Sequence, residues 1–209
     1  LSGKGACALF GLPASGRAQV YAALCRQLDK PLCIVTPGEA EATRFAADLN
    51  TLGIPAAVFP ARDYVLRPIE GTAREYEYRR LAVLGELVGG RLRAVAVPAE
   101  ALTQFTTPKE DFCANTRTLH AGDTLLRDDL LAALFGAGYT RRAQVDGPGQ
   151  FSVRGDIVDI FAPDQKMPVR MEFWGDEIDT LHTFDLTTQR REDAIDKFYL
   201  SPAREVLFG

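Results

Sequence analysis

The sequence predicts an α/β fold in two parts: a P-loop or helicase-like parallel sheet with helices on both faces, plus a small α+β domain with an antiparallel sheet. Two observations lead to this prediction. Short apolar runs alternate with helix-like repeats over the first half of the 209 residues, and from Phe151 onward apolar residues recur at every second position. The pattern changes near Thr107-Pro108, so we expect a first domain over residues 1–112 and a second over residues 113–196.

Strand and helix signals alternate along the first half. Apolar runs predict strands over residues 6–10, 32–35, 56–59 and 94–97. Apolar positions at helical spacing predict helices over residues 20–28, 39–52 and 70–88. Strands that alternate with helices in this way form a parallel sheet covered on both faces.

A glycine loop follows the first predicted strand. Residues 11–18, GLPASGRA, match the spacing of the phosphate-binding pattern G-x-x-x-x-G-K-[ST], with Gly11 and Gly16 at its glycine positions. Arg17 stands where lysine reaches the β- and γ-phosphates, and Ala18 stands where a hydroxyl holds Mg²⁺. No acidic Walker B pattern follows a later strand. The loop therefore indicates ATPase ancestry at a helix N-terminus without ATPase activity.

The second half predicts one helix and then a sheet with one polar face. Asp123 is a candidate N-cap for a helix that ends near Gly136. Strand geometry places Arg170, Glu172 and Trp174 on one side, opposite the apolar residues Val169, Met171 and Phe173. Tryptophan and arginine on an exposed sheet face are typical of protein interfaces. A cation–π pair on a solvated face, or a tryptophan covered by the neighbouring domain, fits the spacing equally well.

Two glycine-containing turns shape this predicted sheet. Gly175-Asp176 is a plausible two-residue hairpin loop, which would place Glu172 opposite Asp179 as a like-charge pair. The apolar positions change parity after Gly155-Asp156, and a β-bulge at the glycine would explain the change. Arg154 precedes this turn and is expected to point outward, toward the same face as Arg170.

The composition indicates a soluble globular protein, with 46% hydrophobic and 25% charged residues. The net charge of −4 excludes a surface that attracts nucleic acid as a whole, and Arg79 and Arg80 alternate with glutamates in the pattern of a solvated helix face. No apolar run is long enough to span a membrane, and no signal peptide is expected. Four cysteines without a pairing pattern predict free, buried thiols in a cytoplasmic protein, and two distant histidines predict no metal site.

Three segments of the second half resemble a known family. Residues 151–161 (FSVRGDIVDIF), 169–178 (VRMEFWGDEI) and 199–203 (YLSPA) are similar to the second domain of the nucleotide-excision-repair protein UvrB. They are equally similar to the UvrB-like N-terminal module of the bacterial transcription-repair coupling factor, Mfd. The resemblance covers essentially the whole chain, and it implies that residues 197–209 begin a return segment into the first domain.

Two departures favour the coupling factor over UvrB. UvrB has a working phosphate loop with lysine and threonine, whereas this chain has Arg17 and Ala18. UvrB also carries a long aromatic-rich hairpin that probes damaged DNA, whereas residues 59–68 here lead quickly to the helix expected from residue 70. The resemblance therefore implies a module without catalytic activity and without a cofactor of its own, since ATP would be used only by domains absent from this chain.

The resemblance implies that UvrA, the damage-recognition ATPase, is the partner of the second domain. The contact surface of the family falls on Arg154, Arg170 and Trp174 here, with Glu172 and Arg141 as weaker candidates. On this basis Arg154→Ala combined with Arg170→Glu is expected to abolish UvrA binding without unfolding the module. RNA polymerase and DNA would be partners of the full-length protein through other domains. The alternative is a fragment of a UvrB-type helicase with residual nucleotide binding.

Overall fold

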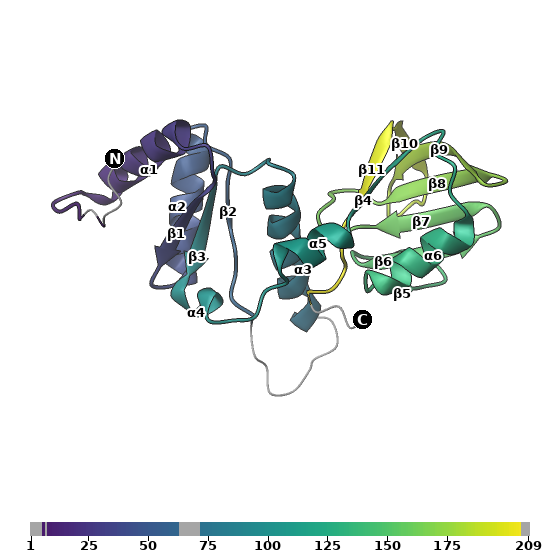
Figure 1. Cartoon of the computed structure of the whole chain (residues 1–209), viewed down its shortest axis with the longest axis horizontal. Coiled ribbons are helices and arrows are strands. Elements are labelled where there is room, and N and C mark those ends of the chain that lie inside the picture. Colours follow the sequence, from purple (N-terminus) through teal and green to yellow (C-terminus); the bar gives the residue numbers. More distant parts are fainter. Residues whose placement is uncertain (1–5, 7, 63–71, 206–209) are drawn as a thin grey trace.

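The computed structural model describes residues 6, 8–62 and 72–205, which form two packed parts with helix α3 between them (Figure 1). The first part contains α1 (Ala14–Gln27), β1 (Leu32–Thr36), α2 (Glu39–Thr51), β2 (Ala56–Val58), α3 (Thr72–Val88), β3 (Ala94–Pro98) and α4 (Ala99–Leu102). Its strands pair in parallel in the order β1-β3-β2. Three of the four strands predicted for the first half therefore form a parallel sheet.

Helices cover both faces of this sheet. Successive residues of β3 point to opposite faces, and all five of them are buried. Ala94 and Ala96 pack in the clusters that α1 and α2 form with the sheet, whereas Val95 and Val97 pack with Val83 of α3. The prediction of helices on both faces is confirmed.

The strand predicted over residues 6–10 is wrong for the described part of that run. Residues 6 and 8–10 carry no strand and take no part in the three-stranded ladder, and the side chains of Leu9 and Phe10 are largely exposed. An apolar run becomes a strand only where a sheet edge supplies partners for its backbone groups. Residues 63–71, which include most of the segment where no long hairpin is predicted, lie outside the described residues.

The structure also bears on two expectations drawn from composition. Within the described ranges, no helix has the length and apolar character needed to cross a membrane. Cys25 is a buried free thiol, but Cys33 and Cys113 are exposed, so the prediction of buried thiols is wrong for those two. Cys33 is exposed because it lies on the edge strand β1, where buried and exposed residues alternate.

The second part is a six-stranded sheet with α6 and a small ladder packed on one face, and the sheet is antiparallel except for the parallel pairing of β5 with β6. It contains α5 (Lys109–Ala114), β4 (Arg117–His120), α6 (Arg127–Gly136), β5 (Thr140–Arg141), β6 (Gln150–Arg154), β7 (Ile157–Phe161), β8 (Val169–Trp174), β9 (Glu177–Phe184), β10 (Arg191–Ala194) and β11 (Lys197–Leu200). The sheet order is β10-β9-β8-β7-β6-β5, and β11 pairs with β4. One core joins Leu130 of α6, Met171 of β8 and Phe198 of β11.

Helix α6 begins three residues later than predicted. It begins at Arg127, and Asp123 does not cap it. Instead, the Asp123 carboxylate accepts a hydrogen bond from the backbone N–H of His120 at 2.8 Å, and Thr124 forms an isolated bridge with Glu177 of β9. The Asp123 side chain therefore stabilises a turn next to the sheet. Aspartate favours both helix N-caps and turns of this kind, so the residue type alone did not decide between them.

The bulge predicted at Gly155 is wrong. Gly155-Asp156 is the two-residue loop of a hairpin, and Val153 lies opposite Val158 without a register shift. Across a two-residue loop, an odd-numbered residue of one strand lies opposite an even-numbered residue of the next. The buried positions therefore change from odd to even numbers without any bulge. The apparent slip in the pattern is a strand reversal.

The second glycine turn is a hairpin as predicted, but its register differs. Trp174 and Glu177 flank the loop, and the ladder shifts between Glu172 and Phe173. Glu172 therefore lies opposite Thr180 rather than Asp179. Arg191 of the adjoining β10 forms an ion pair with Glu172, so the predicted like-charge contact does not form.

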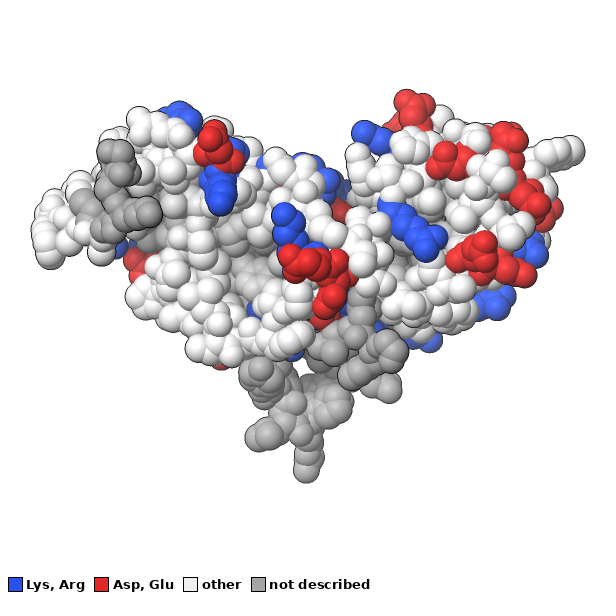
Figure 2. Space-filling model, in the orientation of Figure 1, with Lys and Arg blue, Asp and Glu red and all other residues white. Residues whose placement is uncertain are grey.

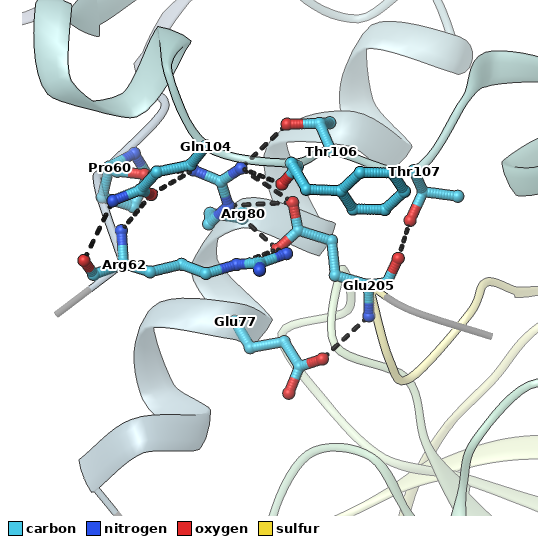
Figure 3. Close-up of polar contacts among 9 residues, drawn as sticks. Pro60, Arg62, Glu77, Arg80, Gln104, Thr106, Thr107 and Glu205 are labelled. Atoms are coloured by element: carbon cyan, nitrogen blue, oxygen red, sulfur yellow. Dashed lines mark hydrogen bonds and ion pairs between the residues drawn. The ribbon is translucent and has the colours of Figure 1, made fainter. Parts of the chain in front are cut away.

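Helix α3 carries a fully buried arginine, Arg80, at the junction of the two parts (Figure 3). Its Nε donates to both carboxylate oxygens of Glu205 at 2.9 Å. Nη1 donates to the Pro60 carbonyl at 2.8 Å and Nη2 to the Thr106 hydroxyl at 2.9 Å. The guanidinium also lies over the Phe59 ring, 4.0 Å from its centroid. The prediction that Arg80 lies on a solvated helix face is therefore wrong.

Glu205 is equally enclosed in this junction. Its carboxylate also accepts a hydrogen bond from a second arginine, Arg62, whose Nε lies 3.0 Å away. Its backbone N–H donates to the Glu77 carboxylate at 2.8 Å, and its carbonyl accepts a hydrogen bond from the Thr107 hydroxyl (Figure 3). Because the backbone and side chain of Glu205 all have partners, this residue fixes the chain that returns from β11 to the first part.

A close approach of α3 to the second part adds to the junction. A Cβ at Gly85 would lie 2.9 Å from the carboxylate of Asp164, so only glycine fits without a shift. The Ser201 hydroxyl donates to that carboxylate at 2.7 Å. Burial raises the pKa of Asp164, and the hydrogen bond from Ser201 opposes the rise.

Candidate functional site

The candidate site is the face of the six-stranded sheet opposite the main core. The register aligns side chains of this face in rows across the strands. One row runs Arg154, Ile157, Glu172 and Thr180, and the next runs Ser152, Asp159, Arg170 and His182. The structure therefore brings Arg154, Arg170 and Glu172 together on one face, as the strand pattern predicts.

A buried carboxylate, Asp159, links the two arginines of this face. Its side chain is 1% exposed. Arg170 binds it with two N–H groups, Nε to Oδ1 at 2.7 Å and Nη2 to Oδ2 at 2.9 Å. Arg154 donates from Nη2 to the same Oδ2 at 2.6 Å. Hydrogen bonding to Asp159 raises the pKa of Arg170.

The expectation that Arg170 is an exposed residue is wrong. Only 9% of it is exposed. Its guanidinium lies 4.7 Å from the centroid of the Phe184 ring, and its Nη1 donates to the Gln189 carbonyl at 3.2 Å. Gln189 has a positive φ of 58° and donates from Nε2 to the Leu186 carbonyl at 2.8 Å, which holds this covering loop in place.

A second apolar cluster explains why half of the face is closed. Val145, Phe161 and Phe184 form this cluster, with Leu186 packed against it. Phe161 and Phe184 belong to the sheet, while Val145 and Leu186 come from loops. The sequence signal for this closed half is a phenylalanine at strand positions where a solvated face would carry polar residues, namely Phe161 and Phe184. For Asp159 the signal was a lone acid inside the apolar run of β7.

The other half of the face, near the hairpin loops, is open. Trp174 is 82% exposed and lies opposite Glu177 at the end of β8. The Arg154 side chain is 47% exposed even though one of its nitrogens binds Asp159. Glu172 is partly covered, since Arg191 and Thr180 both contact its carboxylate. The open surface therefore offers one large aromatic side chain and one half-exposed arginine.

Arg141 is not brought to this surface. It lies on the edge strand β5, where its register partner is Phe151, a fully buried member of the main core. Partners in a ladder share a face of the sheet, so Arg141 lies on the face opposite Arg154. Its position gives no support to a shared role with Arg154 and Trp174.

The glycine loop lies far from this face, at the start of α1. Gly11 has a positive φ of 76°, and Gly16 lies in the first turn of the helix. Arg17 turns toward α2, where it lies 3.5 Å from the Glu41 carboxylate. Ala18 is buried, so no side-chain oxygen is available at the Mg²⁺ position. Within the described ranges, no group of three or more His, Cys, Asp or Glu is arranged to hold a metal ion.

Four arginines of α3 and of the loop between α3 and β3 have partners within the protein. The partners are Glu39 for Arg79, Glu205 for Arg80, Asp164 for Arg91 and the Cys25 carbonyl for Arg93. Figure 2 shows basic and acidic side chains of both parts interspersed on the visible face, without a continuous basic track. Arg80 is buried in the fold, whereas Arg79 and Arg91 form half-exposed ion pairs with carboxylates. Arginines neutralised in this way do not form a phosphate-binding stripe.

Comparison with known proteins identifies relatives of both parts. Residues 118–206 match the family model described as the UvrB interaction domain. The chain is 28% identical over 201 residues to the transcription-repair-coupling factor of Bacillus subtilis, covering 95% of this chain and 17% of that protein. It is 38% identical over 192 residues to that of Mycobacterium bovis, covering 88% and 15%.

The chain is also similar to a protein named UvrABC system protein B. The chain is 28% identical over 216 residues to UvrABC system protein B of Chlorobium limicola, covering 96% of this chain and 32% of that protein. The chain thus spans less than a fifth of the coupling factors and about a third of this relative. Residues 118–206 thus match the UvrB interaction domain model, and nearly the whole chain is similar to one segment of the transcription-repair-coupling factors, as the sequence motifs predict.

Proposed function

We propose that this chain is the UvrB-homology module of a transcription-repair coupling factor and that it docks UvrA through the open half of the sheet face. The observation that carries the proposal is Trp174, an indole that is 82% exposed on the same sheet face as a half-exposed arginine, Arg154, which lies two strands away on β6. Tryptophan and arginine are the residue types most enriched among side chains that dominate binding energy. The exposed indole offers a large, rigid apolar surface together with a polar N–H group for a partner to bind.

The charges around Arg154 favour an acidic group on the part of the partner that meets it. Arg154 and Arg170 share the single carboxylate of Asp159, which leaves one net positive charge at this point. Arg191 and Glu172 neutralise each other beside it. A carboxylate of UvrA that meets the exposed part of Arg154 would form a charge-assisted hydrogen bond, while Trp174 fills an apolar pocket.

Truncation of the two open residues tests the docking proposal. We expect Trp174→Ala and Arg154→Ala each to weaken binding to purified UvrA by about 30-fold or more, because loss of a dominant interface side chain costs about 2 kcal/mol or more. Titration calorimetry measures this directly.

Leu102→Ala is the matched control, since Leu102 is also an exposed apolar residue but lies in the first part. It should bind UvrA like the unmodified chain. If Trp174→Ala and Arg154→Ala both bind within about twofold of the unmodified chain, the open face is not the docking site.

We also propose that the chain has no ATPase activity of its own. Arg17 is engaged by Glu41, and the buried Ala18 offers no oxygen to Mg²⁺, so two contacts of a working phosphate loop are missing. We expect no heat of binding when Mg²⁺ and ATP are titrated into the chain and no release of phosphate. Micromolar affinity for ATP would favour the alternative, a fragment of a UvrB-type helicase with residual nucleotide binding.

The wider role follows from the relatives and extends beyond this chain. In a full-length coupling factor, the module would bring UvrA, and with it nucleotide excision repair, to a stalled RNA polymerase in the cytoplasm. RNA polymerase and DNA would bind other domains, because this chain corresponds to less than a fifth of the coupling factors.

A further inference from the structure

We infer that Asp159 is a positioning residue for docking: it orients Arg154, so binding of UvrA depends on a buried carboxylate that the partner does not touch. This inference rests on the proposed docking function and names the residue that controls its geometry. Nothing in the strand pattern alone assigns such a role to Asp159.

The Asp159 carboxylate is held in place by contacts other than its hydrogen bond with Arg154. It lies on the central strand β7 and is fully buried. Arg170 donates two hydrogen bonds to its carboxylate. The Arg170 guanidinium in turn lies over the Phe184 ring and donates to the Gln189 carbonyl. A two-point guanidinium–carboxylate contact leaves the carboxylate little rotational freedom.

Arg154 depends on this anchor for a defined position. It is the last residue of β6, next to a hairpin loop, and its side chain is long and half exposed. A free arginine side chain samples many rotamers, and ordering it on binding weakens affinity. The 2.6 Å hydrogen bond from Nη2 to Asp159 orders the guanidinium in the unbound protein, so docking is preorganised.

A purely electrostatic view predicts the opposite effect of removing Asp159. Without its charge the face would become more positive, and an acidic partner would be attracted more strongly. If Asp159 instead acts by orienting Arg154, its removal weakens binding even though the attraction increases. The direction of the change therefore distinguishes the two explanations.

The test compares Asp159→Asn with Asp179→Asn, an exposed carboxylate on β9 of the same sheet. We expect Asp159→Asn to bind UvrA about 2- to 12-fold more weakly, the equivalent of ordering one long side chain, through faster dissociation. Asp179→Asn should bind UvrA normally. In an Arg154→Ala background, Asp159→Asn should cause no further loss, because its effect passes through Arg154.

Two measurements keep the test decisive if Asp159→Asn fails to fold. Arg154→Lys retains the surface charge but has a single nitrogen, which cannot bind Asp159 and a partner in the same geometry, so it should bind UvrA nearly as poorly as Arg154→Ala. In the free unmodified chain, side-chain NMR should show slowed motion of the Arg154 guanidinium relative to that of the exposed Arg117.

The outcomes separate this inference from the proposed function. Equal or tighter binding by Asp159→Asn, or full binding by Arg154→Lys, overturns the positioning role while the docking site stands. A guanidinium of Arg154 as mobile as that of Arg117 also overturns it. If Arg154→Ala and Trp174→Ala leave UvrA binding unchanged, the docking site itself fails, whatever the NMR result.

Discussion

Replacing Arg80 with methionine is expected to lower the free energy of unfolding by about 3–5 kcal/mol, because the change leaves a buried carboxylate without its main partner. Arg80 and Glu205 are both fully buried. The variant also removes the donors that bind the Pro60 carbonyl and the Thr106 hydroxyl. Arg62 still reaches Glu205, but it cannot replace these contacts. Urea denaturation followed by circular dichroism measures the loss.

The neighbouring residue provides a matched control. Arg79 precedes Arg80 on α3, but its side chain is 47% exposed and only approaches the exposed Glu39 at 3.5 Å. Arg79→Met should change stability by less than about 0.5 kcal/mol, as surface ion pairs contribute little. Equal midpoints for Arg80→Met and the unmodified chain would show that the junction does not stabilise the fold.

Local sequence patterns predicted the elements well because their causes are local. The alternation of apolar runs and helical repeats located β1, β2, β3 and the three long helices, since each pattern reflects one element packing on its neighbours in sequence. The hairpin at Gly175-Asp176 was predicted for the same reason, as the turn needs only a few residues. The run over residues 6–10 failed because a strand also requires a partner edge.

The environment of single charged residues was harder to predict. Helical spacing placed Arg80 beside glutamates of its own helix, but its partner Glu205 lies 125 residues away. Strand parity placed Arg170 on the correct face, yet Phe184 and Gln189 cover that part of the face. Periodicity shows which side of an element a residue occupies, whereas burial of that side depends on segments distant in the chain.

The two buried ion pairs share one arrangement. In each, a buried carboxylate binds a buried arginine that lies over a phenylalanine ring: Glu205 with Arg80 over Phe59, and Asp159 with Arg170 over Phe184. Each carboxylate also binds a second, more exposed arginine, Arg62 or Arg154. A buried pair that gains extra hydrogen bonds can offset its desolvation. The first pair joins the two parts, and the second supports the docking face.

This arrangement changes the expected result for Arg170→Glu. The substitution is expected to destabilise the second part by at least about 3–5 kcal/mol, because it breaks a buried pair and places a second carboxylate beside Asp159. The sequence-based expectation was that Arg154→Ala combined with Arg170→Glu abolishes UvrA binding without unfolding. We now expect both to be lost, so weak binding by this variant would not identify Arg170 as a contact residue. Urea denaturation followed by circular dichroism measures the stability.

Arg141→Glu is the control for this substitution, since it makes the same charge change on the exposed edge strand β5 and should alter stability by less than about 0.5 kcal/mol. Arg170→Lys separates the two roles further: it keeps the charge beside Asp159 but loses the two-point contact, so its stability should lie between those of Arg170→Glu and the unmodified chain. If Arg170→Glu unfolds at the same urea concentration as the unmodified chain, Arg170 is a surface residue, and its loss can be interpreted as loss of a direct contact with UvrA.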